Sequence, residues 1–92
     1  DLILFSNPAV PVGRTHMTIR ASLDNAQTWT SSKLIFSGPS AYSCLTRLPN
    51  GRVGLFFEHG MQRGYEDMIF VSFSPKLLFS DFDFNKILPN PN

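Results

Sequence analysis

Short segments of apolar or alternating residues, separated by turn residues, make up most of this chain. Residues 2–6 are a continuous apolar run, which is typical of a strand buried on both faces. Residues 7–13 contain two prolines and a glycine and predict a break. From 14 to 22 apolar and polar residues alternate. This period of two predicts a half-buried strand.

The same reading predicts four further strands, at 33–36, 43–48, 53–58 and 67–73. We expect residues 37–40, Ser-Gly-Pro-Ser, to end the first of these. The Asn50-Gly51 pair indicates a tight hairpin between the second and the third. No helix is needed to explain the pattern. The fold class is therefore all-β, and short strands at this spacing are typical of a propeller, a sandwich or a barrel.

Composition narrows the possible partners and cofactors. The 92 residues include nine phenylalanines, which favours sheets packed face to face. A formal net charge of +1 gives no basis for a nucleic-acid or anionic-membrane partner. The single cysteine, Cys44, excludes an internal disulfide framework, and neither His16 nor His59 has the partner spacing of a metal site. No apolar run reaches the roughly 18 residues of a membrane span.

Residues 22–29, SLDNAQTW, predict a structured turn. Ser22 and Asp24 have short side chains that can bond the backbone of a turn, and Thr28 and Trp29 restart a strand. The octet resembles the Asp box, the S-x-D-x-G-x-T-W turn that recurs in sialidase β-propellers. In that family the boxes lie on the outer rim, away from the substrate. The resemblance therefore implies a structural role for these four residues and not a catalytic one for Asp24.

One position departs from the Asp-box pattern, since Ala26 replaces its glycine. If that position needs a positive φ, alanine there costs on the order of 1 kcal/mol.

The segment before the octet resembles the part of sialidases that supplies the third arginine of the arginine triad, which here would be Arg14. In the family three arginines from different blades converge on the carboxylate of sialic acid. A planar guanidinium suits a carboxylate because it can donate two parallel, charge-assisted hydrogen bonds. Taken alone, an arginine beside proline and glycine is a solvated loop residue. The downstream motifs favour the binding role.

Residues 37–43, SGPSAYS, resemble the sialidase segment that bears the tyrosine nucleophile, which implies this role for Tyr42. A phenol suits the reaction because the anomeric carbon of sialic acid bears a carboxylate, which repels a carboxylate nucleophile. A free phenol has a pKa near 10, so a base must take its proton. In the family that base is a glutamate earlier in the chain. Without the flanking motifs, Tyr42 would be read as an aromatic at the start of a strand.

Residues 53–58 resemble the sialidase strand whose closing glutamate, here Glu58, supports one of the triad arginines. The alternative is a solvated glutamate at a strand end. The resemblance places the first two triad arginines, the acid/base aspartate and the base for the tyrosine in blades that precede this segment.

We therefore expect residues 1–74 to be the C-terminal part of a six-bladed sialidase propeller, about one and a half to two blades. Residues 75–92 are expected to be a tail that packs on or beyond it. The implied activity of the complete enzyme is exo-α-sialidase, which hydrolyses terminal α-linked sialic acid with retention through a sialyl-tyrosine, without metal or cofactor. The segment alone is expected to be inactive. The alternatives are a trans-sialidase, a non-catalytic Asp-box propeller that binds glycan or protein, and a small independent β-domain.

The implied partners are a sialylated glycoconjugate and the N-terminal blades of the same enzyme. The substrate in turn implies a secreted, periplasmic or lysosomal protein.

Overall fold

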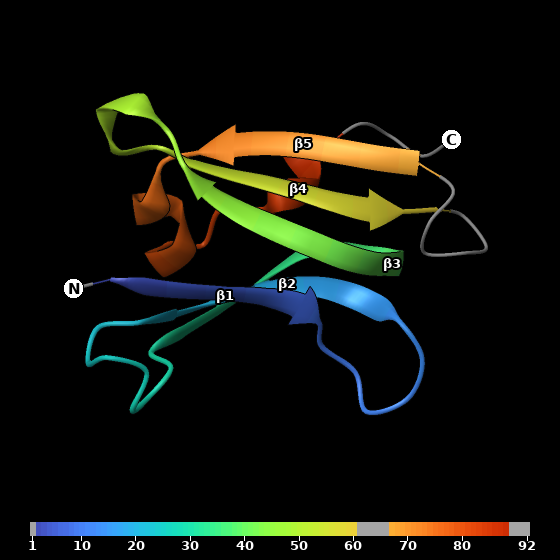
Figure 1. Ribbon diagram of the computed structural model, residues 1–92, viewed down its shortest axis with the longest axis horizontal. Coiled ribbons are helices and arrows are strands. Elements are labelled where there is room, and N and C mark those ends of the chain that lie inside the picture. Colours follow the sequence, from blue (N-terminus) through green and yellow to red (C-terminus); the bar gives the residue numbers. More distant parts are fainter. Residues whose placement is uncertain (1, 61–66, 89–92) are drawn as a thin grey trace.

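The computed structural model describes residues 2–60 and 67–88 and contains five strands joined as one antiparallel meander (Figure 1). The strands are β1 (Ile3–Pro8), β2 (Thr15–Ser22), β3 (Ser31–Arg47), β4 (Val53–His59) and β5 (Asp67–Phe73). The same described residues contain three short 3₁₀ helices after β3 or β5, namely η1 (Pro49–Gly51), η2 (Pro75–Phe79) and η3 (Phe84–Lys86). No α-helix occurs in the part of the chain that the structure describes. The all-β fold class is confirmed.

The strand β3 corrects one expectation from the sequence. Residues 37–40 do not end a strand, because β3 continues through them and changes its pairing partner there. It pairs with β2 as far as Pro39 and with β4 from Ser40 onward. Gly38 permits this course, since an added Cβ would lie 2.9 Å from the ring of Phe36. In Figure 1, β3 leaves the layer of β1 and β2 and enters the layer of β4 and β5.

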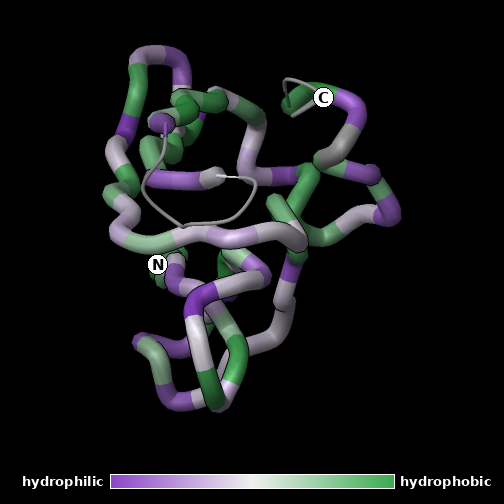
Figure 2. The backbone as a smooth tube through the Cα atoms, turned by 90° about the vertical axis from the view of Figure 1, so that its right-hand side faces the viewer, coloured by the Kyte–Doolittle hydropathy of each residue, from purple (hydrophilic) through white to green (hydrophobic). Residues whose placement is uncertain are grey.

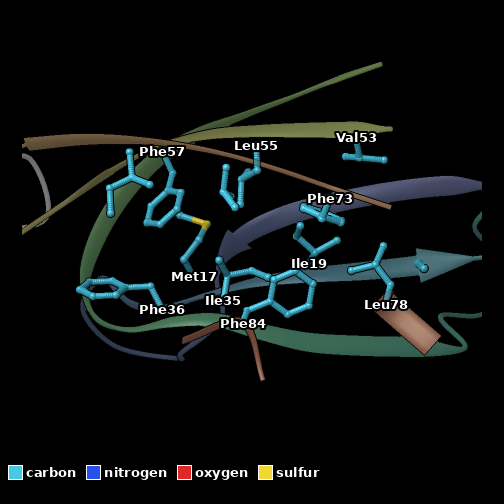
Figure 3. Packing of buried hydrophobic residues seen from close by; sticks show 13 residues of the cluster. Met17, Ile19, Ile35, Phe36, Val53, Leu55, Phe57, Phe73, Leu78 and Phe84 are labelled. Atoms are coloured by element: carbon cyan, nitrogen blue, oxygen red, sulfur yellow. The ribbon is translucent and has the colours of Figure 1, made fainter. Parts of the chain in front are cut away.

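The two layers face each other across one hydrophobic core. Figure 3 shows side chains from β2 and the first half of β3 pointing toward side chains from β4 and β5. Hydrophobic and polar residues alternate along the backbone (Figure 2), as strands with one buried face require. The buried cluster consists of Met17, Ile19, Ala21, Ile35, Phe36, Val53, Leu55, Phe57, Ile69, Val71, Phe73, Leu78 and Phe84.

The segment after β5 takes part in this core. Leu78 on η2 and Phe84 on η3 are each 1% exposed, and the Phe84 ring meets the Phe73 ring edge to face at 5.1 Å. Residues 75–88 of the expected tail therefore pack against both layers of strands. Residues 89–92 lie outside the described residues.

The hairpin between β3 and β4 forms where the Asn50-Gly51 pair predicts it. Both residues have a positive φ, 61° and 76°. A hairpin turn needs these φ values to match the twist of its two strands. The Leu48 N–H donates to the Arg52 carbonyl at 2.8 Å and closes the turn.

The sheet order gives β3 a particular place in the architecture. It is the edge strand of the β1-β2-β3 group and also the edge strand of the β3-β4-β5 group. Two successive antiparallel groups that share a strand and pack face to face are consistent with part of a β-propeller, whose blades are four-stranded antiparallel sheets. None of the helices in the described residues is long and apolar enough to cross a membrane.

Candidate active site

The structure brings together Arg14, Tyr42 and Glu58, the three residues to which the sequence assigned chemistry. The Arg14 guanidinium carbon lies 5.3 Å from the centre of the Tyr42 ring. The Tyr42 N–H donates to a carboxylate oxygen of Glu58 at 3.3 Å. They come from the loop before β2, from the middle of β3 and from the end of β4. Arg14 thus contacts the ring of Tyr42, and Glu58 contacts its backbone.

Backbone contacts hold Arg14 against β3. Gly13 has a φ of 79°, which lets the loop turn into β2. The Arg14 carbonyl accepts a hydrogen bond from the Ser40 N–H at 3.0 Å. Because Ser40 precedes Tyr42 by two residues, this bond fixes the loop of the arginine beside the strand of the tyrosine.

His16 marks local backbone strain near Arg14. Its φ is 64°, an unusual value for a residue other than glycine, and the pairing of β2 with β3 shifts register on both sides of Met17. The carbonyl of His16 accepts from Ala9 N–H and from the Thr18 hydroxyl, at 3.0 and 2.7 Å. Strain of this kind, about 1–3 kcal/mol, is concentrated at functional sites in proteins.

Tyr42 lies at the surface of the described part of the chain and is accessible to solvent. Its side chain is 73% exposed, in contrast to Ala41 beside it, which is 4% exposed. The tyrosine borders an open hollow of about 230 Å³ on the outer face of β3, β4 and β5. The hollow is lined by Tyr42, Ser43, Cys44, Phe56, Glu58 and Met68.

Arg14 provides the positive charge of this site. The guanidinium of Arg14 is attracted to the face of the Tyr42 ring, a contact of about 0.5–1 kcal/mol at an exposed position. The same cation has donors left for an incoming anion, since a guanidinium has five N–H groups. Among the described residues no group of three or more histidine, cysteine, aspartate or glutamate side chains is placed to hold a metal ion.

The turn at residues 22–29 lies at the other end of β2 from Arg14 (Figure 1). With roughly 3.3 Å per residue along a strand, Ser22 is about 25 Å from the arginine. The Ser22 hydroxyl donates to Asp24 at 2.8 Å and accepts from the Ala26 N–H at 2.8 Å. Asp24 accepts from the N–H and the hydroxyl of Thr28, at 2.8 and 2.5 Å.

These bonds shift the titration of the aspartate. They lower the pKa of Asp24 to about 2, with the Thr28 hydroxyl as the largest cause and the Thr28 N–H and Ser22 hydroxyl after it. Ala26 has a φ of 68°, so this position does need a positive φ. Trp29 is 42% exposed and packs against Phe5 at a ring distance of 6.1 Å. Ser22, Asp24, Thr28 and Trp29 therefore serve the turn and its packing.

Sequence reasoning did not find the residues that fasten the site. Ser6 on β1 and Ser43 on β3 share a hydrogen bond of 2.7 Å between their hydroxyls, directly beside Tyr42. Ser40 holds the Arg14 carbonyl through its backbone. Their side chains and spacing have no distinctive pattern, because each contact depends on how β1 and the β1–β2 loop lie against β3.

Several proteins named Sialidase resemble this chain over most of its length. One from Micromonospora viridifaciens is 48% identical over 59 residues, which are 64% of this chain and 9% of that protein. Human Sialidase-4 is 35% identical over 79 residues, which are 78% of this chain and 16% of that protein. A Bacteroides fragilis protein is 38% identical over 61 residues, 63% of this chain and 11% of that protein.

No family model matches the chain. The chain spans between 9% and 16% of the length of these relatives. With identities of 35 to 48%, the matches show that it belongs to the sialidases, a family of glycoside hydrolases, and corresponds to a short segment of them.

Proposed function

We propose that the complete protein containing this chain is an exo-α-sialidase and that this segment supplies its nucleophile, Tyr42. The observation that supports this most is the convergence of Arg14 and Tyr42, with 5.3 Å between guanidinium carbon and ring centre. Nothing in the packing of a binding module requires an exposed tyrosine and an exposed arginine to be fastened together by backbone bonds.

In this proposal Arg14 binds the carboxylate of sialic acid and Tyr42 attacks the anomeric carbon. The phenolic oxygen forms a bond to that carbon as the bond to the leaving glycan breaks. The phenolic proton goes to a base, and the glycan oxygen receives a proton from an acid. Water then cleaves the sialyl-tyrosine and restores the phenol, so that two displacements give retention. The acid and the base are assigned to other blades, and the scheme uses no metal or cofactor.

Glu58 supports a triad arginine from another blade in the same scheme. Its carboxylate would lower the mutual repulsion of three clustered guanidinium groups and fix one of their planes.

The outer faces of the two layers support a larger propeller around this segment. Phe5 is 46% exposed on one face, while Phe56 and Phe70 are 45% and 53% exposed on the other. Paired exposed aromatic residues of this kind mark surfaces that pack against a partner. We assign the partner to the neighbouring blades of the same protein, with a sialylated glycoconjugate as the substrate.

The test is to trap the covalent intermediate in the complete protein. A sialosyl fluoride with a second fluorine on the carbon beside the anomeric centre should label the enzyme. The second fluorine slows both displacements, whereas the fluoride leaving group speeds the first, so the sialosyl-tyrosine forms faster than water cleaves it. Peptide mapping should find the added sialosyl mass at Tyr42 and not at Tyr65, the other tyrosine of the chain. Tyr42→Phe should lose both the label and at least about 100-fold of kcat on a fluorogenic sialoside.

Label at any other residue, or full activity in Tyr42→Phe, would refute the assignment of the nucleophile. A complete protein that binds sialosides without hydrolysing them would instead support the non-catalytic propeller.

A further inference from the structure

The backbone around Tyr42 departs from regular strand pairing. Ser40 pairs with His59 and Ser43 pairs with Phe57, so β3 has two residues where β4 has one. Ala41 and Tyr42 therefore both lie opposite Glu58. This is a β-bulge, which bends the strand, redirects a side chain and leaves one residue without its ladder hydrogen bond.

The side chain of Glu58 satisfies the backbone at this bulge. One of its carboxylate oxygens accepts the Tyr42 N–H at 3.3 Å. Glu58 is half-buried, whereas the tyrosine side chain is 73% exposed. Little packing holds the phenol in place, so the direction of its Cα–Cβ bond depends on the backbone conformation of the bulge. The carboxylate acts on that conformation without touching the phenolic oxygen.

Contacts on either side of Tyr42 restrict the remaining freedom of the segment. Before it, the Ser40 N–H bonds the Arg14 carbonyl at 3.0 Å. After it, the hydroxyl of Ser43 bonds that of Ser6 at 2.7 Å. Between these two contacts, the Glu58 carboxylate bonds the backbone of the tyrosine itself.

We propose that Glu58 is a positioning residue that aims Tyr42 by holding the bulge from the opposite strand. This inference rests on the proposed function, in which Tyr42 is the nucleophile, and adds a role to the arginine support already assigned to Glu58. The role requires a hydrogen-bond acceptor of the right length at position 58. It does not require a negative charge, which distinguishes it from action as a base or as the partner of an arginine.

Three variants of the complete protein separate these roles. Glu58→Gln keeps an acceptor oxygen at the same reach and removes the charge. Glu58→Ala removes both. Asp67→Ala is the matched control, because this exposed carboxylate begins β5, is paired with His59 and bonds the N–H of Met68 at 2.8 Å instead of Tyr42.

The first measurement is amide hydrogen exchange at Tyr42, resolved by NMR or by peptide mass spectrometry. Glu58→Ala should speed exchange of the Tyr42 N–H at least about tenfold, while Glu58→Gln and Asp67→Ala should leave it within about twofold of the parent protein. Unchanged exchange in Glu58→Ala would overturn the proposal, because the carboxylate would then not hold this N–H. This readout needs no activity, so it remains decisive even if the proposed function fails.

The second measurement is the kinetics of fluorogenic sialoside hydrolysis. A misplaced nucleophile should lower kcat about 100-fold in Glu58→Ala, and Glu58→Gln should restore most of kcat. Both variants should raise KM by a similar few-fold factor, because both lose the charge that supports an arginine of the carboxylate site. If kcat in Glu58→Gln is as low as in Glu58→Ala, an acceptor at position 58 does not aim the tyrosine and the positioning role is wrong. A parent protein without hydrolysis would contradict the proposed function and leave the exchange result as the test of the bulge.

Discussion

The hydroxyl of Ser22 donates to the carboxylate of Asp24 at 2.8 Å, at the point where β2 ends. Both side chains then accept hydrogen bonds from the backbone that follows, Ser22 from the Ala26 N–H and Asp24 from the Thr28 N–H. Two short polar side chains therefore replace the ladder bonds that a turn cannot make. Because the turn lies at the far end of β2 from Arg14, changes to it test the fold separately from the chemistry.

Replacing Ala26 with glycine should stabilise the protein. Ala26 has a φ of 68°, and its Cβ makes this conformation unfavourable, whereas glycine adopts it without strain. After the larger loss of chain entropy for glycine, we expect a net gain of about 0.5–1 kcal/mol in the free energy of unfolding, measured by urea denaturation. Asn25→Gly is the control. Asn25 also has a positive φ, 60°, but asparagine tolerates it, so the gain there should be smaller. An equal gain at both positions would contradict this explanation.

Removal of the hydroxyl should destabilise the protein at one of two fully buried serines and have little effect at the other. Ser22 and Ser40 are both 0% exposed, but Ser22 bonds the turn while the Ser40 hydroxyl has no partner among the described residues. Ser22→Ala should cost about 1–3 kcal/mol, because the Ala26 N–H loses its acceptor. Ser40→Ala should change stability by less than about 0.5 kcal/mol, since no bond is lost. Thermal unfolding of the two variants under identical conditions makes the comparison, and a similar loss in both would mean that Ser40 has a partner.

The turn should loosen in acid over a defined range. Hydrogen bonds from Thr28 and Ser22 lower the pKa of Asp24 from 3.8 to about 2. Because the pKa is lower in the folded state, the stabilisation from the ionised carboxylate is complete above pH 3.8 and is lost as the pH falls through about 2. An NMR titration should show the Thr28 amide and the Asp24 carboxyl carbon changing together in this range. Asp24→Asn should remove the transition at Thr28, and a midpoint near 3.8 in the parent protein would contradict the hydrogen-bond explanation.

The sequence predicted those features that depend on local patterns. Alternating residues located β2, the Asn50-Gly51 pair located the hairpin, and residues 22–29 predicted a turn with the observed bonds. The continuous β3 was missed, because Gly38 and Pro39 usually end a strand. Here Pro39 lies where β3 changes its pairing partner from β2 to β4. Its missing N–H therefore removes no hydrogen bond from the middle of either ladder.

The candidate site was predictable as a set of residues but not as an arrangement. The sequence assigned chemistry to Arg14, Tyr42 and Glu58, and the structure places the three together. No pattern in the sequence indicated the bulge that sets Tyr42 opposite Glu58. The register depends on the pairing between strands, which only the fold determines. The contacts of Ser6 and Ser43 were hidden for the same reason.

The proposed carboxylate site predicts that the shape of Arg14 matters as well as its charge. Arg14→Lys keeps the cation but replaces the planar fork with a point charge, so it cannot donate two parallel bonds to a carboxylate. In the complete protein we expect kcat/KM for a fluorogenic sialoside to fall about 10- to 100-fold, the range of a lost charge-assisted hydrogen bond, with much of the change in KM. Arg47→Lys is the matched control, because Arg47 is exposed and is the last residue of β3, beyond the segment of β3 that contacts Arg14. Equal effects at the two positions would show that Arg14 contributes only general charge, and the carboxylate would then have to bind elsewhere.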